Sequence, residues 1–181
     1  MRFSVTSLLT FSSLAFSLPI EQQPNANPTE TAIQQTTRGL KTLSNSLNAL
    51  TARNADVVSL SSQIMRNGNE LTSIMREGAY QVRRGADLNL NDALFLTQPV
   101  NDMITQTQQT TQNWVASKRV IIGSGGKTVT LNILNDHLAA AAEFSDAMVA
   151  KMPALGKSIA QLYGTRAKML IETAINEYKR S

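Results

Sequence analysis

The sequence predicts an all-α protein, an antiparallel bundle of about five helices that follows a cleaved signal peptide. Apolar residues recur at intervals of three and four positions through nearly all of the chain after residue 28, which places them on one face of a helix. No stretch shows the strict alternation of apolar and polar residues typical of a half-buried strand. The 181 residues include no cysteine, so an aliphatic core must stabilise the bundle without disulfide bonds.

The first 17 residues have the pattern of a secretory signal peptide. Arg2 precedes a short apolar stretch, and Ala15-Phe16-Ser17 is a small-x-small site of the kind that signal peptidase cleaves. The stretch is too short to span a membrane, and no second hydrophobic segment indicates a transmembrane helix. We therefore expect a signal peptide over 1–17, a mobile polar leader over 18–28 and one helical-bundle domain over 29–181. The mature protein is expected to be secreted and to act extracellularly or in the cell wall.

The first two helices have clear boundary signals. Asn27 is a favourable cap, Pro28 occupies the first helical position, and Glu30 follows three residues after the cap. The first helix is expected over 29–52, with a narrow stripe of leucines. The second is expected over 55–83, where Gly68 indicates a bend or a close contact with another helix.

The remaining helices follow with short connectors. The third opens at Asn89, and Pro99 within it predicts a kink or a break. A glycine-rich connector around 120–126 leads to a fourth helix over 128–151. The fifth starts at Pro153 and carries its apolar residues along one side as far as Tyr178.

Three patterns that could indicate catalysis are better explained by ordinary helix and loop chemistry. The segment 123–128 is similar to the end of a phosphate-binding loop, but Ile121 stands where that motif requires its first glycine. His137 is the only histidine, which excludes a multi-histidine metal site, and no Gly-x-Ser-x-Gly elbow accompanies it. Glu143 and Asp146 are explained as solvated carboxylates one turn apart. The sequence thus predicts no enzyme, metal or cofactor.

The charge and the methionine content indicate which kinds of partner the protein could bind. The net charge of +4 is small and scattered, so it does not indicate a nucleic acid. Six methionines after Met1 lie mostly on or beside the apolar stripes. Because methionine adapts to irregular shapes, they fit either an ordinary core or a deformable apolar cavity.

The later part of the chain resembles a known family. The run 138–153, LAAAAEFSDAMVAKMP, and the closing AINEY at 174–178 resemble the fungal hydrophobic surface-binding protein A family, which includes cell-wall galactomannoproteins. The segment 89–104 is similar to a helix start in that family. The resemblance implies a secreted helical protein that attaches to hydrophobic surfaces or holds a fatty acid between its helices. It implies no catalytic residues.

These observations favour a non-enzymatic protein that binds a fatty acid, another lipid or a hydrophobic solid surface through an apolar groove between helices. Association with cell-wall polysaccharide stays open. The alternative is a structural cell-wall or surface-coat protein, or a secreted effector, without a small-molecule ligand. The apolar positions expected to face a lipid are Ile64, Leu71, Met75, Leu96, Met103, Leu134, Leu138, Leu162 and Leu170. The candidate polar anchors for a carboxylate are Tyr163, His137, Lys118 and Arg119.

The signal-peptide prediction is tested by N-terminal sequencing of secreted material. We expect the first residue to lie near Leu18, because cleavage follows the small residue at Ser17. Secreted protein that begins at Met1 would contradict the prediction.

Overall fold

The computed structural model describes residues 27–52 and 55–180. The expected signal peptide over 1–17, and the leader apart from its last two residues, lie outside the described residues. The described ranges form helices and connectors without any strand, which confirms the predicted all-α fold. The helices are α1 (Pro28–Leu50), α2 (Val57–Arg84), α3 (Leu90–Phe95), α4 (Thr97–Gly123), α5 (Lys127–Lys151) and α6 (Ala154–Lys179).

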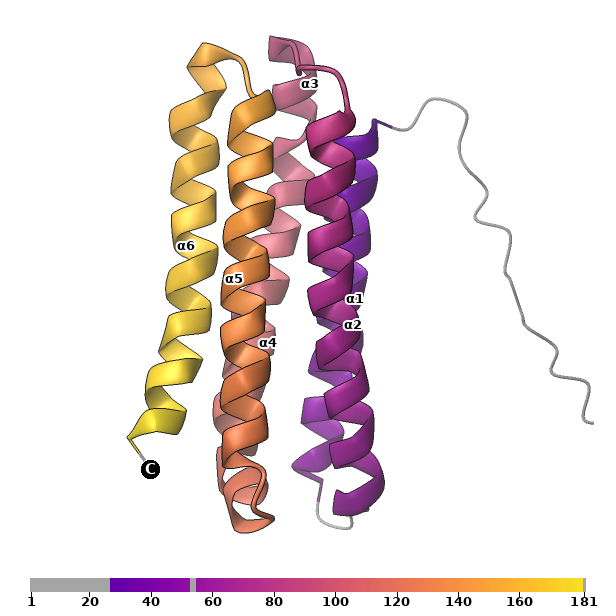
Figure 1. Cartoon of the computed structure of the whole chain (residues 1–181), viewed down its shortest axis with the longest axis vertical. Coiled ribbons are helices and arrows are strands. Elements are labelled where there is room, and N and C mark those ends of the chain that lie inside the picture. Colours follow the sequence, from indigo (N-terminus) through magenta and orange to yellow (C-terminus); the bar gives the residue numbers. More distant parts are fainter. Residues whose placement is uncertain (1–26, 53–54, 181) are drawn as a thin grey trace, which may run out of the picture.

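The five long helices form a closed ring, and long helices that follow one another along the chain run in opposite directions (Figure 1). Each packs mainly against two others, in the spatial order α1, α2, α5, α6, α4 and back to α1. The consecutive helices α4 and α5 are therefore not principal packing partners. The short α3 covers one end of the ring, near the start of α6 (Figure 1). None of the helices in the described ranges is both long enough and apolar enough to cross a membrane.

The helix ends are set by nearby capping side chains, a proline and a glycine turn. The side chain of Asn27 accepts a hydrogen bond from the Thr29 amide at 2.9 Å, and Pro28 begins α1 as predicted. Asp56 caps α2 in the same way, through the Ser59 amide. The glycine-rich segment that is similar to a phosphate-binding loop is the turn between α4 and α5. Gly125 has a φ of 79° there, a conformation that glycine adopts without strain.

The break predicted near Pro99 is present, but it lies three residues earlier. Helix α3 ends at Phe95, and α4 begins at Thr97, so that Pro99 falls in the first turn of α4. Proline is tolerated in a first turn because the amides there have no acceptor within the helix. Because the helix is broken at Leu96, the ring of Pro99 has no preceding helical turn to clash with.

Polar side chains of α4 donate hydrogen bonds to α1. Both helices are rich in threonine, serine and glutamine. Thr110 Oγ1 donates to the Leu40 carbonyl at 3.2 Å, and Ser117 Oγ donates to the Leu47 carbonyl at 2.9 Å. The Asn113 amide lies between them and donates to Ser44. These bonds pair α1 and α4 in parallel and satisfy polar groups that would be costly to bury alone.

Helix α6 is buried only in its last third. Its buried residues are Ile171, Ala174, Ile175 and Tyr178. Its first half exposes large apolar side chains, with Leu155 at 78% and Ile159 at 56% exposure. Between these parts Gly164 lies directly against the side chain of Ser145 on α5, so the two helices approach closely there. The last turns of α6 therefore attach it to the bundle, and Gly164 sets its spacing from α5.

The Gly164 contact predicts a difference between two Gly→Ala variants. A Cβ added at Gly164 would overlap the Ser145 side chain, so Gly164→Ala should lower the free energy of unfolding by about 1–3 kcal/mol. Gly123, also helical, has nothing within 4 Å of such a Cβ. Gly123→Ala should leave stability unchanged or raise it by at most about 1 kcal/mol. Chemical denaturation measures both, and equal effects would contradict the close approach of α5 and α6.

Candidate functional site

A cavity of about 160 Å³ lies inside the ring of helices. All five long helices contribute to its lining, and α3 contributes at one end. On α4 the lining extends from Leu96 to Trp114, which corresponds to about 27 Å along the helix axis. On α6 it extends from Leu155 to Ile171, or about 24 Å. The cavity is therefore long and narrow, and it follows the bundle axis.

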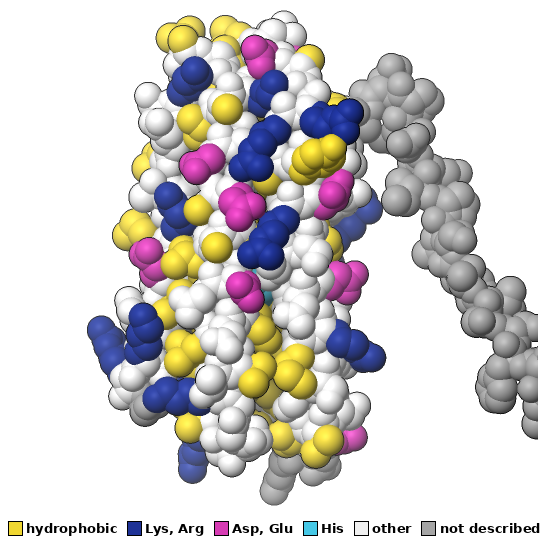
Figure 2. All heavy atoms as spheres, in the orientation of Figure 1, with side chains coloured by type: hydrophobic (Ala, Val, Ile, Leu, Met, Phe, Trp, Pro, Cys, Tyr) yellow, Lys and Arg dark blue, Asp and Glu magenta, His cyan; other side chains and the backbone are white. Residues whose placement is uncertain are grey.

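The outer end of the cavity is apolar and reaches the surface. Four of its lining residues there are exposed hydrophobic side chains from α3 and α6: Leu90, Leu94, Leu155 and Ile159. Figure 2 shows apolar side chains at the end of the molecule where α6 begins. We refer to these four residues as the mouth. The mouth exists because the first half of α6 has no fully buried side chain.

The inner end of the cavity lies about halfway along the bundle and is more polar. Its lining there includes Thr107, Thr110 and His137. Thr107 donates to the Met103 carbonyl at 2.8 Å, and Thr110 donates to carbonyls of both α4 and α1. These hydroxyl groups are thus satisfied within the protein.

His137 forms a buried contact between α5 and α2. Its Nε2 lies 2.8 Å from the Gly68 carbonyl, so Nε2 carries the hydrogen and donates. Burial lowers the pKa of His137 below its ordinary value, which the Gly68 carbonyl and nearby Asp136 only partly offset. Gly68 permits this approach, since a Cβ there would lie 2.8 Å from the Ile133 side chain. The close helix contact, one of the two expectations for Gly68, is the one observed.

The structure brings together five of the nine apolar residues that the sequence suggested as lipid-facing. The cavity lining includes Leu71, Met75, Leu96, Met103 and Leu134. That these side chains contact a ligand stays a prediction.

The other four lie outside the lining. Ile64 is buried in the core beyond the inner end, and Leu138 and Leu170 pack against the core from its edge. Leu162 is 67% exposed. On α5 the lining positions are Leu134, His137, Ala141, Phe144, Ser145 and Met148, and Leu138 lies at the edge of the face that they form, about 40° around the helix from Leu134.

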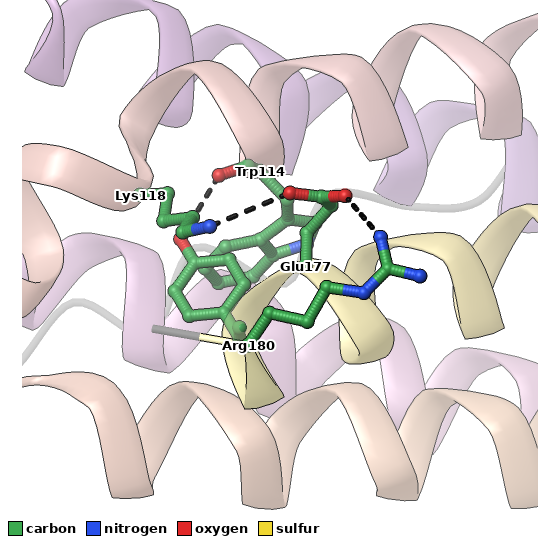
Figure 3. Close-up of polar contacts among 5 residues, drawn as sticks. Trp114, Lys118, Glu177 and Arg180 are labelled. Carbon is green, nitrogen blue, oxygen red and sulfur yellow. Dashed lines mark hydrogen bonds and ion pairs between the residues drawn. The ribbon is translucent and has the colours of Figure 1, made fainter.

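Of the candidate polar anchors, Tyr163 and His137 line the cavity and the two basic residues do not. Lys118 lies beyond the inner end, where its Nζ is 3.4 Å from the Glu177 carboxylate of α6 (Figure 3). Arg119 is exposed on α4. The lining therefore contains no lysine or arginine.

Sequence reasoning did not select several lining residues, among them Thr36, Trp114, Phe144, Met148 and Met152. Phe144 and Met148 on α5 and Met152 directly after it follow each other at intervals of four, a spacing that could have identified them. Within the described ranges, no group of three histidine, cysteine or acidic side chains is arranged to hold a metal ion. The arrangement is suited to enclosing an apolar molecule.

The fold and the site define a helical bundle with an elongated internal cavity that is lined mostly by apolar side chains. The family model described as hydrophobic surface binding protein A matches residues 26–150. The chain therefore belongs to this family, and the resemblance seen in the sequence is confirmed.

Similar proteins come from fungi. Cell wall mannoprotein 1 of Aspergillus flavus is 25% identical over 181 residues, covering 99% of this chain and 63% of the relative. This chain thus spans about 63% of the length of that protein. Ligand binding domain 2 of the MP1 protein of Penicillium marneffei, complexed with multiple arachidonic acids, has a TM-score of 0.78 at 19% identity, covering 89% of this chain and all of that chain.

AFMP4P in complex with palmitic acid has a TM-score of 0.77 at 15% identity, covering 85% of this chain and 99% of that chain. At these identities the two structures show a shared fold.

The buried histidine predicts that stability depends on pH. Below about pH 6.5 the unfolded chain protonates His137, while the folded protein, with its lowered pKa, does not. The unfolded state then binds more protons, so the free energy of unfolding should fall as the pH falls, by up to about 1.4 kcal/mol per pH unit. Denaturation of the parent and of His137→Gln between about pH 7.5 and pH 5 measures how much His137 contributes to the pH dependence of the free energy of unfolding. The same pH dependence in both proteins would contradict it.

Proposed function

We propose that this chain is a secreted, non-enzymatic protein that holds a long-chain fatty acid in the cavity, in the cell wall or outside the cell. The observation that carries the proposal is the cavity itself, which is long, narrow and mostly apolar and which opens through the mouth. The arachidonic and palmitic acids named with two proteins of the same fold support this class of ligand. The mannoprotein relative supports the location.

The length of the cavity fits such a ligand. A carbon–carbon bond of about 1.52 Å advances an extended chain by about 1.25 Å, so a sixteen-carbon acid extends over about 19 Å. The lining spans about 24–27 Å along α4 and α6. A saturated chain can therefore lie parallel to the helices.

The volume of the cavity adds a condition. About 160 Å³ is below the roughly 300–1,000 Å³ typical of pockets for drug-sized ligands. Binding therefore requires the first half of α6 to move outward from α4 and α5. Of this half only Ala160 and Tyr163 pack against the core, and neither is fully buried, so its movement breaks fewer contacts than movement of the last turns of α6 would.

An estimate of the energetics is consistent with useful affinity. Burial of about fifteen methylene groups, at about 0.8 kcal/mol each, contributes about 12 kcal/mol. Association costs at least about 4 kcal/mol. The remaining 8 kcal/mol or less corresponds to dissociation constants of about 1 μM or weaker from methylene burial alone.

Attachment to hydrophobic surfaces is a second candidate function. Phe95 of α3 is 80% exposed, and it directly follows the mouth residue Leu94, which is 63% exposed; the mouth residue Leu155 of α6 is 78% exposed. A cluster of large exposed apolar side chains at one end of a bundle is typical of an interaction surface. The family description also supports this function.

Calorimetric titration of delipidated protein with palmitic acid tests the fatty-acid proposal. We expect the parent to bind one molecule. Met103→Trp should weaken binding at least tenfold with little loss of thermal stability, because the indole fills the cavity. Leu162→Trp is the matched control, since Leu162 is exposed and outside the lining, and it should bind like the parent.

Two results together would remove the proposal. They are an absence of palmitic acid binding by the parent and a large fall in the melting temperature of Met103→Trp, as expected if a filled core is overpacked. The structural or surface-coat alternative would then be favoured.

A further inference from the structure

We infer that the middle of the cavity is a site for the hydroperoxide group of an oxidised fatty acid, which Met75 and Met103 reduce to an alcohol while Thr36 holds it by a hydrogen bond. This inference rests on the proposed function and adds to it a ligand class and a reaction in which each methionine is used once. The three residues come from α2, α4 and α1, and all three line the cavity.

The first argument is the distribution of the methionines. Of the methionines in the described ranges, those that line the cavity are Met75, Met103, Met148 and Met152. The remaining two, Met65 and Met169, are 39% and 61% exposed and lie outside the lining. A thioether fills apolar space as leucine does, but peroxides also oxidise its sulfur. The cavity is therefore lined with reducing groups that an apolar lining alone would not require.

The second argument is an unpartnered hydroxyl group. Across the described ranges, the buried side-chain polar atoms without a hydrogen-bond partner are Thr36 Oγ1 and Trp114 Nε1. Thr36 is only 2% exposed and lines the cavity. By contrast, Thr107 and Thr110 of the same lining donate to backbone carbonyls. Because a buried hydroxyl is costly to leave unpaired, Thr36 indicates that a polar group of the ligand binds beside it.

The hydrogen bonds between α4 and α1 fix the depth of Thr36 in the cavity. The residues that they join are 69 or 70 positions apart in the chain. Thr36 is therefore level with Gln106 of α4. At about 1.5 Å per residue, this level lies about 15 Å inward from Leu96 and about 12 Å outward from Trp114, the two ends of the lining on α4. Trp114 is thus too deep to bind the same ligand group as Thr36.

Met75 of α2 lies at the depth of Thr36. Helices α1 and α2 run antiparallel (Figure 1), and a Cβ at Gly39 of α1 would lie 3.1 Å from the Leu71 side chain of α2. Three residues back along α1 and three residues forward along α2 from this contact, Thr36 is level with Ile74. Met75 is the next residue.

Met103 of α4 lies on the other side of Thr36. It is three residues before Gln106, or about 4.5 Å nearer the mouth. Because α1 packs between α2 and α4 in the ring, Thr36 has Met75 on one side and Met103 on the other. Met75 and Met103 belong to the same packed cluster of apolar side chains. We refer to Thr36, Met75 and Met103 as the mid-cavity cluster.

A fatty acid of either orientation brings the middle of its chain to the mid-cavity cluster. At about 1.25 Å per carbon, the level of Thr36 is about twelve carbons from the outer end of the lining and about ten from the inner end. The middle carbons of common unsaturated fatty acids carry the double bonds, and oxidation forms hydroperoxide groups beside these bonds. The cluster therefore lies where a fatty-acid hydroperoxide carries its oxidising group.

The reaction needs only the ligand and the cluster. A lone pair of the Met75 or Met103 sulfur attacks the terminal oxygen of the hydroperoxide, so that an S–O bond forms and the O–O bond breaks. The sulfur is oxidised to a sulfoxide, and the hydroperoxide is reduced to an alcohol. The proton of the terminal oxygen reaches the leaving alkoxide through the Thr36 hydroxyl, which gives up one proton as it takes up the other. The alcohol product keeps a hydrogen-bond partner in Thr36.

Peptide mapping by mass spectrometry locates this reaction. Delipidated protein is incubated with linoleic acid hydroperoxide or with tert-butyl hydroperoxide, which has no long chain. With the first, sulfoxide at Met75 and Met103 should form at least about tenfold faster than at Met65 and Met169, because binding holds the peroxide beside the cavity methionines. With the second, the exposed methionines should react first. The same order of reaction with both peroxides would overturn the inference.

Calorimetric titration with unoxidised linoleic acid separates failure of the inference from failure of the proposed function. Binding of linoleic acid without selective oxidation of Met75 and Met103 would overturn the inference and leave fatty-acid binding intact. An absence of linoleic acid binding would refute both.

A pair of double variants tests the two sulfurs. Met75→Leu with Met103→Leu nearly conserves volume, so the protein should fold. With protein in excess and all hydroperoxide bound, its conversion to the hydroxy acid should slow at least about tenfold, as measured by chromatography. Met65→Leu with Met169→Leu, the matched control, changes residues outside the lining and should convert at the parent's rate. Equal rates for the two double variants would contradict the inference.

A further set of variants tests the hydroxyl group of Thr36. Thr36→Val should slow conversion of the bound hydroperoxide about tenfold, because the hydrogen bond is lost, and Thr36→Ser should restore the rate. Thr105→Val is the control, since Thr105 is exposed on α4 and outside the lining. An unchanged rate in Thr36→Val would contradict the part of the inference that concerns Thr36.

Discussion

The contact between Tyr178 and Trp114 fixes the last helix to the bundle, and the site depends on it. The two rings meet edge to face at 84° with centroids 6.4 Å apart, and the Tyr178 hydroxyl donates to the Trp114 carbonyl. Both side chains are almost fully buried, and burial raises the pKa of Tyr178 well above its ordinary value. The ion pair of Lys118 with Glu177 lies at the edge of this contact, where solvent limits its contribution.

This attachment divides the ring of helices into two halves. Trp114 lines the inner end of the cavity, and beyond it the interior is filled by leucines of α1 and by Tyr178. Toward the mouth α6 has no buried anchor of its own, and Gly164 and Ser145 set its approach to α5. A ring of five helices encloses more space than its aliphatic side chains fill in that half. The cavity is the consequence of this packing.

The fold was predictable from the sequence because its signals are local. The intervals of three and four, the Asn27 cap and Pro28 at the first helical position each act within a few residues, and the structure has a helix wherever they indicate one. The break lies three residues before Pro99 and not at it, because a proline can occupy the first turn of the following helix. The order of the helices in the ring depends on contacts between distant segments, which no local signal contains.

The site was predictable only in part, for the same reason. An apolar stripe covers a wide arc of a helix, so spacing alone does not separate Leu134, which lines the cavity, from Leu138, which lies beside it. The sequence also gave no sign that Thr36 and Trp114 would lack partners, because that follows from the distance between α1, α4 and α6. Hydroxyl groups one turn away along α4 do find acceptors.

The central claim is that one half of the bundle is closed and the other opens to admit a fatty acid. Hydrogen exchange measured by mass spectrometry, with and without palmitic acid, tests this claim most directly. Without ligand, the amides of 171–178 should exchange more slowly than those of 155–167, since only the former segment has fully buried side chains. Palmitic acid should then slow exchange in 155–167 and in 90–103, and leave 171–178 unchanged. Equally slow exchange along all of α6 without ligand, with no response to palmitic acid, would contradict the account.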